Sequence, residues 1–257
     1  ISEKRCGDRV KLFIQFDKPL DYFLTEAKNG RQFEYTLNRK ASVKDIIESF
    51  GIPHTEVGHI SFNGMEIDFS FIPSSSGLLN VQCIEPPFNV MSPTFLRPFS
   101  LKRTRFLADV NVIKLGRLLI IMGFDVSYSS SLSDHEIADI SETETRIILT
   151  RDTELLKRKK IIFAKRIKAN YPYEQLVETI HFFGLEKQIS FFSRCTKCNN
   201  KLVGVSKEKV IHLLEPKTKK FFDIFFQCPQ CNNVFWKGSH FDNIKKKISS
   251  IGISIKH

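Results

Sequence analysis

Two apolar runs in this chain end close to an aspartate. Residues 105–108 precede Asp109, and residues 146–149 precede Thr150, Arg151 and Asp152. Short apolar runs of this kind predict buried strands, and parallel strands deliver the residues at their carboxyl ends into one crevice. We therefore expect these carboxylates to converge on Mg²⁺ or Mn²⁺, hard cations that can activate water for attack on phosphorus.

Other polar side chains fall near the same predicted edge. Asp134 starts the helix expected between the two strands, and Thr150 offers a hydroxyl. Glu136 is a reserve ligand, although a solvated helix face explains this residue better. Asp109 could instead cap the helix that begins near residue 111. Three acids at one rim repel one another unless protons or cations separate them, so their convergence would itself predict a metal site.

Basic residues flank these acids. Lys114, Arg117 and Arg151 lie on the next helical turns, where they could hold a phosphate, or they are ordinary surface charges. Residues 1–90 carry 10 Lys and Arg against 12 Asp and Glu, which leaves 29 against 16 for residues 91–257. Because neutralising phosphates is a large share of nucleic-acid binding, the second part of the chain is the expected RNA-binding part.

Four cysteines form two Cys-x-x-Cys pairs, Cys195 with Cys198 and Cys228 with Cys231. Thiolates at this spacing suit a tetrahedral Zn²⁺ site, and four sulfur ligands leave no position for substrate. We therefore expect a structural zinc. The other two cysteines, Cys6 and Cys83, look unpaired, which favours a reducing compartment.

Aromatic and basic residues alternate after the second pair, in the sequence Phe-Trp-Lys-Gly-Ser-His at 235–240. Such a segment could stack on and hold unpaired bases. The favoured alternative is that this segment forms the core of a zinc ribbon, with a histidine whose hydrogen bonds are satisfied. His240 would act as a metal ligand only if one cysteine pair were incomplete, and neither is.

The N-terminal part predicts a small helix-backed sheet. Alternating apolar residues indicate strands at 10–16 and 32–37, a capped amphipathic helix follows at 42–50, and 79–84 is a further strand. Asn63-Gly64 is a strong two-residue hairpin signal, because both residues tolerate positive φ. Four prolines between residues 85 and 104 then indicate a linker.

Strand-like and helix-like segments alternate beyond the linker. Strands are expected near 105–108, 125–128, 146–149 and 160–164, with helices near 111–122, 134–142, 153–158 and 172–184. This alternation of strands and helices favours a parallel sheet covered by helices on both faces.

Residues 104–241 resemble the Mut-seven C-terminal RNase family, a branch of the PIN-like nucleases with an attached zinc ribbon. The matching pieces are Phe106-Leu107-Ala108-Asp109, Leu115-Gly116-Arg117-Leu118-Leu119, Gly123-Phe124-Asp125, Arg146-Ile147-Ile148-Leu149-Thr150-Arg151-Asp152, Phe192-Ser193-Arg194-Cys195 and Trp236-Lys237-Gly238-Ser239-His240. The resemblance implies metal-dependent RNA cleavage that leaves a 5′-phosphate, with Asp109, Asp134 and Asp152 as metal-binding acids.

Two positions need comment within that resemblance. Asp125 belongs to the shared pattern, but it lies where a strand begins, so we expect a structural role for it. Ile120 and Ile121 stand where the family tends to place an arginine and a leucine, which affects the expected grip on substrate more than the chemistry.

Residues 9–87 resemble the ubiquitin-like domain that often precedes this nuclease. Conjugated members of that superfold end in a free Gly-Gly, whereas this chain continues through Glu85-Pro86-Pro87. We therefore expect a fused docking module with a protein partner. The expected order is an α/β chain with a β-grasp domain at 9–87, a linker at 88–103, a PIN-like domain at 104–189, a zinc ribbon at 190–242 and a basic tail at 243–257.

The predicted function is that of a metal-dependent, endonucleolytic ribonuclease in the cytoplasm, with RNA as partner and no membrane segment. One alternative is a non-catalytic RNA-binding or ribosome-associated module that keeps the fold without turnover. Another is a toxin-like enzyme restricted to one structured RNA. Cleavage of RNA under Mg²⁺ or Mn²⁺ separates the first hypothesis from the non-catalytic one.

Overall fold

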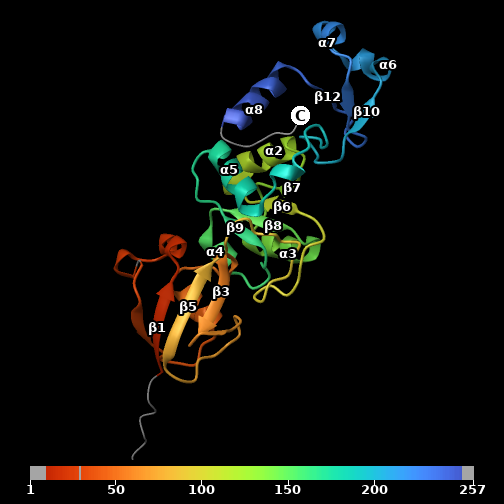
Figure 1. Cartoon of the computed structure of the whole chain (residues 1–257). Helices are drawn as coiled ribbons and strands as arrows, with labels where there is room; N and C mark the ends of the chain where they lie inside the picture. The colour runs from red at the N-terminus through yellow and green to blue at the C-terminus, as the bar shows by residue number, and fades with distance from the viewer. Residues whose placement is uncertain (1–9, 29, 251–257) are drawn as a thin grey trace, which may run out of the picture. The chain divides into compact units, whose positions relative to one another are not determined.

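A computed structural model describes residues 10–28 and 30–250 of the chain, which form two compact units (Figure 1). The first unit consists of the described residues within Ile1–Glu85, Ser92–Ser100 and Asp152–Ala164, and the second of those within Pro86–Met91, Leu101–Arg151 and Lys165–His257. Cys6 and residues 251–257 of the predicted tail lie outside the described residues. None of the helices described is long and apolar enough to cross a bilayer.

The first unit is built on a five-stranded sheet in the order β2-β1-β5-β3-β4. Its strands are β1 (Lys11–Phe16), β2 (Phe33–Thr36), β3 (Val57–Phe62), β4 (Met65–Glu66) and β5 (Gly77–Cys83). The central pair β1 and β5 is parallel, and the other pairs are antiparallel. Short 3-10 helices at Lys18–Phe23, Glu26–Lys28 and His54–Glu56 complete the unit's connections.

One face of this sheet is covered by α1 (Val43–Ser49). Every second residue of β1 is buried, and these residues share a core with the apolar face of the helix. Ser42 caps α1 by accepting a hydrogen bond from the amide of Asp45 at 3.1 Å, and Asn63 and Gly64 turn the chain with φ of 49° and 83°. The expected helix-backed sheet is confirmed.

Arg97 ties irregular segments to this sheet. The side chain is only 3% exposed and donates to the carbonyls of His54, Thr55 and Val57 at 2.9–3.1 Å and to that of Ile162 at 3.3 Å. Burial lowers the pKa of its guanidinium to about 10, so the group remains charged at neutral pH. Residues 92–100, predicted as part of a linker, therefore pack as part of the first unit.

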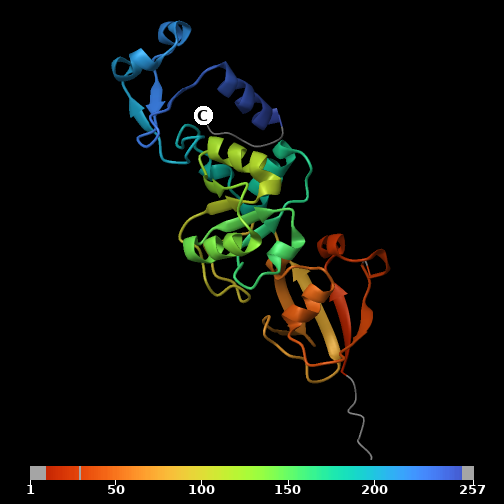
Figure 2. The same cartoon turned by 180° about the vertical axis from the view of Figure 1, so that it is seen from behind.

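The second unit contains a four-stranded sheet in the order β7-β6-β8-β9. Its strands are β6 (Arg105–Ala108), β7 (Asp125–Tyr128), β8 (Ile147–Thr150) and β9 (Ala164–Arg166), and β6 pairs with both β7 and β8 in parallel. Helices α2 (Ile113–Ile121) and α5 (Pro172–Phe183) lie together on one face and α3 (Asp134–Glu144) on the other (Figures 1 and 2). The predicted parallel sheet is confirmed.

Two details of the second half differ from the sequence prediction. The last strand begins at Ala164 and not near residue 160, because α4 (Thr153–Leu156) is followed by turns in which Lys157, Arg158 and Ile161 donate to carbonyls three residues earlier. Residues 243–250, predicted as the start of a tail, belong to helix α8 (Ser239–Ser250), in which Ile248 is fully buried.

The cysteine-bearing segment forms a third small sheet of β10 (Val203–Val205), β11 (Phe225–Gln227) and β12 (Val234–Trp236). Two short helices that the sequence analysis did not predict, α6 (Lys207–Val210) and α7 (Pro216–Phe221), are inserted between β10 and β11. Its core contains only Val210, Leu214 and Phe225 as buried apolar residues. A core of this size needs a further constraint to be stable.

Replacing Arg97 tests the role of this side chain in the first unit. We expect Arg97→Ala to lower the free energy of unfolding by about 2–4 kcal/mol, because it leaves buried carbonyls without their charged donor. Calorimetric melting of the full chain measures the change. The matched control is Arg39→Ala, which removes an exposed arginine of the same unit. Equal melting of the two variants would contradict the assignment.

Candidate active site and metal centre

Asp109 lies at the carboxyl end of β6, at the point where the strand order of the sheet reverses. The chain runs from β6 to the neighbouring β7 on one side and then to β8 on the other. Crevices at such switch points are the usual ligand sites of open α/β sheets. The Asp109 amide donates to the carbonyl of Leu149 in β8 at 3.0 Å, and the residue is 8% exposed.

Three neutral donors hold the Asp109 carboxylate. Its Oδ1 accepts from the Val110 amide at 2.6 Å, and its Oδ2 accepts from the Thr150 hydroxyl and the Asn111 amide group, each at 2.6 Å. Thr150 is completely buried. Thr150, expected to offer a hydroxyl near the same edge, therefore contacts Asp109 directly. The capping role also exists, since Asp109 precedes a short 3-10 helix (Val110–Val112) and accepts from the Val110 amide.

Asn111 is a site residue that the sequence analysis used only to mark a helix start. Its side chain contacts Asp109 and Thr150 and accepts a hydrogen bond from the Arg151 amide at 2.9 Å. It thus joins the ends of β6 and β8. The spacing Asp-x-Asn directly after a strand was the available signal, because such side chains hydrogen-bond to nearby backbone.

Within the described residues, no lysine, arginine or histidine forms an ion pair with Asp109. A buried carboxylate is costly unless it is paired or bound to a metal. Hydrogen bonds from neutral groups offset part of this cost. The Asp109 carboxylate thus has hydrogen-bond donors but no ion-pair partner among the described residues.

The other predicted acids occupy helix starts. Asp134 is the first residue of α3, and Asp152 caps α4 by accepting from the amides of Glu154 and Leu155. Glu136 closes a capping box, in which its carboxylate accepts from the Ser133 amide and hydroxyl and its own amide donates to the Ser133 hydroxyl. Asp152 belongs to the first unit, whereas Asp109 and Asp134 belong to the second.

The predicted basic residues separate into different environments. Lys114 is exposed on the first turn of α2, and Arg151 follows Thr150 directly and donates to the Asn170 side chain at 2.8 Å. Arg117 lies on the next turn of α2, with its guanidinium carbon 5.9 Å from the centre of the Tyr128 ring. Lys114 and Arg151 therefore lie within a few residues of Asp109 and Thr150 along the chain. Arg117 instead lies over the Tyr128 ring at the end of β7.

The four predicted zinc ligands come together. The sulfur atoms of Cys195 and Cys231 are 3.5 Å apart, those of Cys198 and Cys228 are 3.3 Å apart, and all four lie within 4.8 Å of one another. With Zn–S bonds of about 2.3 Å, the sulfurs of a tetrahedral site are roughly 3.8 Å apart. This cluster therefore fits a zinc ion. In residues 10–28 and 30–250, it is the only group of three or more His, Cys, Asp or Glu with such spacing.

Both cysteine pairs continue as Cys-x-x-Cys-Asn-Asn and fold alike. The first asparagines, Asn199 and Asn232, adopt φ of 61° and 57° and donate their amides back to the first cysteine of their pair. Asn233 also donates its side-chain amide to the Cys231 sulfur at 2.9 Å, and this hydrogen bond lowers the pKa of the Cys231 thiol to about 6. The Asn-Asn that follows each cysteine pair is thus the sequence signal of this shared turn.

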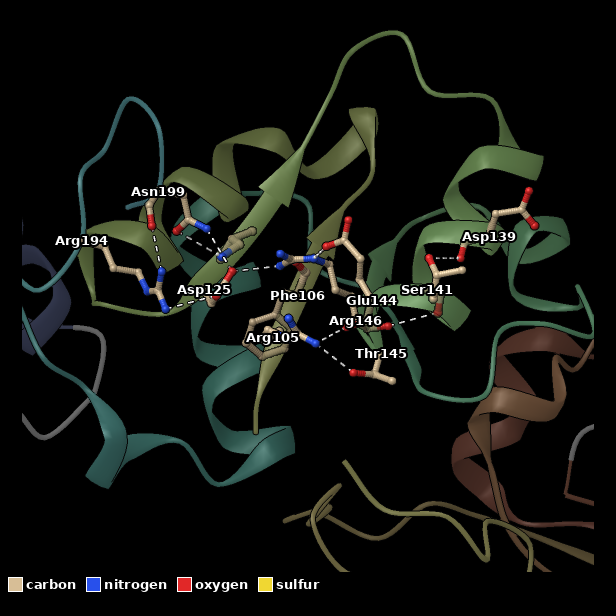
Figure 3. A network of polar contacts seen from close by, with 12 residues as sticks. Arg105, Phe106, Asp125, Asp139, Ser141, Glu144, Thr145, Arg146, Arg194 and Asn199 are labelled. Carbon is tan, nitrogen blue, oxygen red and sulfur yellow. Dashed lines mark hydrogen bonds and ion pairs between the residues drawn. The ribbon is translucent and has the colours of Figure 1, made fainter. Parts of the chain in front are cut away.

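Asp125 anchors the first cysteine pair to the parallel sheet (Figure 3). This first residue of β7 accepts from Arg146 at 2.9 Å, from the Asn199 side chain at 3.0 Å and from Arg194 at 3.2 Å. Burial by itself would raise the pKa of the Asp125 carboxyl. The hydrogen bond from Arg146 and the positive charges of Arg146 and Arg194 outweigh this effect, so the pKa lies below the ordinary value of an aspartate. The network agrees with the predicted structural role of Asp125.

Asp125→Asn should destabilise the second unit by about 1–3 kcal/mol at neutral pH, because two arginines lose their half-buried anion. A lowered carboxyl pKa contributes stability above its unfolded value, and this contribution disappears as pH falls through the folded value. Denaturant titrations at pH 7 and below pH 3.8 measure both effects. A difference between variant and wild type that stays constant with pH would contradict this role.

Zinc content tests the cysteine cluster. We expect about one zinc per chain, loss of that zinc in Cys198→Ser or Cys228→Ser, and a lower melting temperature for both variants, since the ribbon core is too small to be stable without its metal. Elemental analysis and calorimetry provide the measurements. Cys83→Ser is the control, because Cys83 lies in the first unit and is no part of the cluster. Full zinc retention in either ligand variant would disprove the site.

Comparisons with known proteins bear on both halves of the chain. Residues 104–248 match the family model described as the Mut7-C RNAse domain, and residues 9–89 match the one described as Mut7-C ubiquitin. Neither the curated proteins nor the solved structures contained a match. The first match covers more than half of the chain, and the family that it identifies indicates a nuclease-like role. The chain therefore belongs to the Mut7-C RNAse domain family and carries a ubiquitin-like domain ahead of its nuclease domain.

Proposed function

We propose that this chain is a metal-dependent ribonuclease that hydrolyses phosphodiester bonds within RNA. Membership of an RNase family and the basic character of the second part of the chain support this function. The main structural support is Asp109, a buried carboxylate at a sheet switch point that is held by neutral groups alone. A divalent cation is the partner that such a group lacks.

The proposed roles follow from the hydrogen bonds. Asp109 would bind the cation, and Thr150 and Asn111 fix the orientation of its carboxylate. Asp134 and Asp152 are the proposed further ligands, with Glu136 in reserve. The carboxylate oxygens of these residues are the donors that Mg²⁺ and Mn²⁺ prefer. When bound, the cation would supply an activated water and neutralise charge on the phosphate.

Basic side chains would position the substrate. Lys114 is exposed, one helical turn from Asn111, and the Arg151 amide is already bound to the Asn111 side chain. Both could contact phosphates on either side of the cleaved bond. Such contacts determine the register of the RNA and carry no sequence information themselves.

Asp109→Asn provides the direct test. The asparagine keeps an oxygen that can accept from Thr150, but it removes the charge that would bind the cation. We expect RNA cleavage under Mg²⁺ or Mn²⁺ to fall on the order of 100-fold or more, with zinc content and melting temperature near those of the wild type. Asp134→Asn and Asp152→Asn should also reduce the rate.

The control is Glu174→Gln, which neutralises an exposed carboxylate at the start of α5. Gel analysis of a labelled, unstructured RNA gives the rates, and sequencing of the product ends locates the cut. Undiminished cleavage by Asp109→Asn would refute the assignment of this residue.

One observation favours a second function, that of an RNA-binding module without turnover. Asp109, Asp134 and Asp152 are not among the described side chains that form a compact ligand group. Under this alternative the protein binds RNA equally well with and without Mg²⁺ and cleaves none. The assay above separates the two functions, because the non-catalytic protein shows no difference between wild type and Asp109→Asn.

We also propose that the ubiquitin-like domain docks a protein partner, because it continues into the rest of the chain and so has no free C-terminus for conjugation. A reducing compartment such as the cytoplasm fits the cysteines, of which five are described as free thiols and four of these form the metal cluster.

A further inference from the structure

A groove of about 940 Å³ runs through the second unit beside the parallel sheet. Its walls come from α2, from the end of β7, from the first cysteine pair, from β12 and from α8. The side chains that matter for its chemistry are Arg117, Tyr128, Lys197, Phe235, Trp236 and Phe241. Its volume falls within the range of about 300–1,000 Å³ of sites that hold drug-sized ligands.

Aromatic side chains form the ribbon side of this groove. Phe235 in β12 lies opposite Phe226 in β11, and the Phe226 ring stacks on Phe192 with centroids 5.4 Å apart and an angle of 20°. Phe192 in turn contacts Phe241 of α8 at 4.7 Å. This packing holds the groove's aromatic wall in place. Bases stack on such rings without regard to sequence, because every base has a π-face.

Trp236 belongs to this wall and to the small ribbon core, where it lies 6.4 Å from Phe225. The sequence analysis offered two roles for residues 235–240, base stacking and ribbon core, and we assign one to each of two adjacent residues. Trp236 supports the core, and Phe235 lines the groove on the face that it shares with Phe226. The side chain of His240 lies outside the described residues.

Exposed positive charge also lines the groove. Lys197 is exposed between the two cysteines of the first pair, and Arg117 is exposed on α2 above the Tyr128 ring. Arg194 also lines the groove, but it is bound to Asp125 and the Asn199 carbonyl. Lys197 and Arg117 are thus the residues available for phosphates, and no acidic side chain lines the groove within the described residues.

The groove begins at the edge of the sheet that carries Asp109. Tyr128, the last residue of β7, is the register partner of Ala108, which directly precedes Asp109 in β6. Neighbouring strands are about 4.8 Å apart. Besides Tyr128, the groove is lined by Arg194, Thr196 and Lys197 around the first cysteine pair, and the neighbouring Asn199 is bound to Asp125 at the start of β7. A strand bound at Asp109 could therefore continue directly into it.

We propose that this groove binds an unpaired stretch of RNA next to the cleavage site, with bases on Phe235 and phosphates on Lys197 and Arg117. The inference rests on the proposed function, for which it names single-stranded RNA as the substrate class. A duplex could not use the aromatic wall, because its bases are already stacked on one another and paired.

Binding of a labelled twelve-nucleotide oligouridylate to the full chain, without added divalent cations, tests the proposal independently of cleavage. We expect Phe235→Ala to weaken binding about 5- to 100-fold. Lys197→Ala should reduce the slope of log affinity against log salt by about 0.7. The matched controls are Phe221→Ala and Lys217→Ala, which change exposed residues of α7 outside the groove and should bind as the wild type does.

Three outcomes would overturn the groove proposal: wild-type affinity in Phe235→Ala with zinc retained, an unchanged salt slope in Lys197→Ala, or equal competition by duplex RNA. If only the proposed ribonuclease function fails, the binding assay still gives the expected losses in Phe235→Ala and Lys197→Ala, but the RNA is not cleaved. If both proposals hold, Phe235→Ala raises the RNA concentration needed for half-maximal cleavage and leaves the rate at saturating RNA unchanged.

Discussion

The parallel pairing of β6 with β7 and β8 is the constraint on which the rest of the second unit depends. It places Asp109, Thr150 and Tyr128 at the carboxyl edge of one sheet and Asp125 and Arg146 at its amino edge. The aspartates at the two edges of the sheet differ in the charge of their hydrogen-bond donors. Asp125 is surrounded by arginines and holds structure together, whereas Asp109 has only neutral donors.

This difference explains why two aspartates of one sheet are assigned opposite roles. A carboxylate between two arginines is already neutralised, and a cation brought to it would have to displace them. A carboxylate held by an amide, a hydroxyl and an asparagine has no cation to displace. These neutral hydrogen bonds offset only part of the cost of burying it, which is why the proposed cation is assigned to Asp109 and not to Asp125.

The same sheet also connects the zinc ribbon to the proposed cleavage site. Asn199 belongs to the first cysteine pair and contacts Asp125, so the metal cluster and the edge strand β7 are fixed to each other. The aromatic groove contacts the end of that strand, at Tyr128, and the first cysteine pair. If the cysteine cluster holds zinc, the metal would fix Lys197 and the ribbon beside the proposed RNA groove.

The sequence by itself determined the order of the ubiquitin-like and nuclease domains along the chain, the parallel sheet and the spacing of the four cysteines. These follow from local periodicity and spacing, which act within a few residues of the chain. Tertiary structure alone decided that Asn111 closes the Asp109 network, that Arg117 faces an aromatic groove and that residues 92–100 are bound by Arg97. Each of these depends on partners brought together from segments distant in sequence, and no local pattern encodes which side chain of a helix or loop will face them.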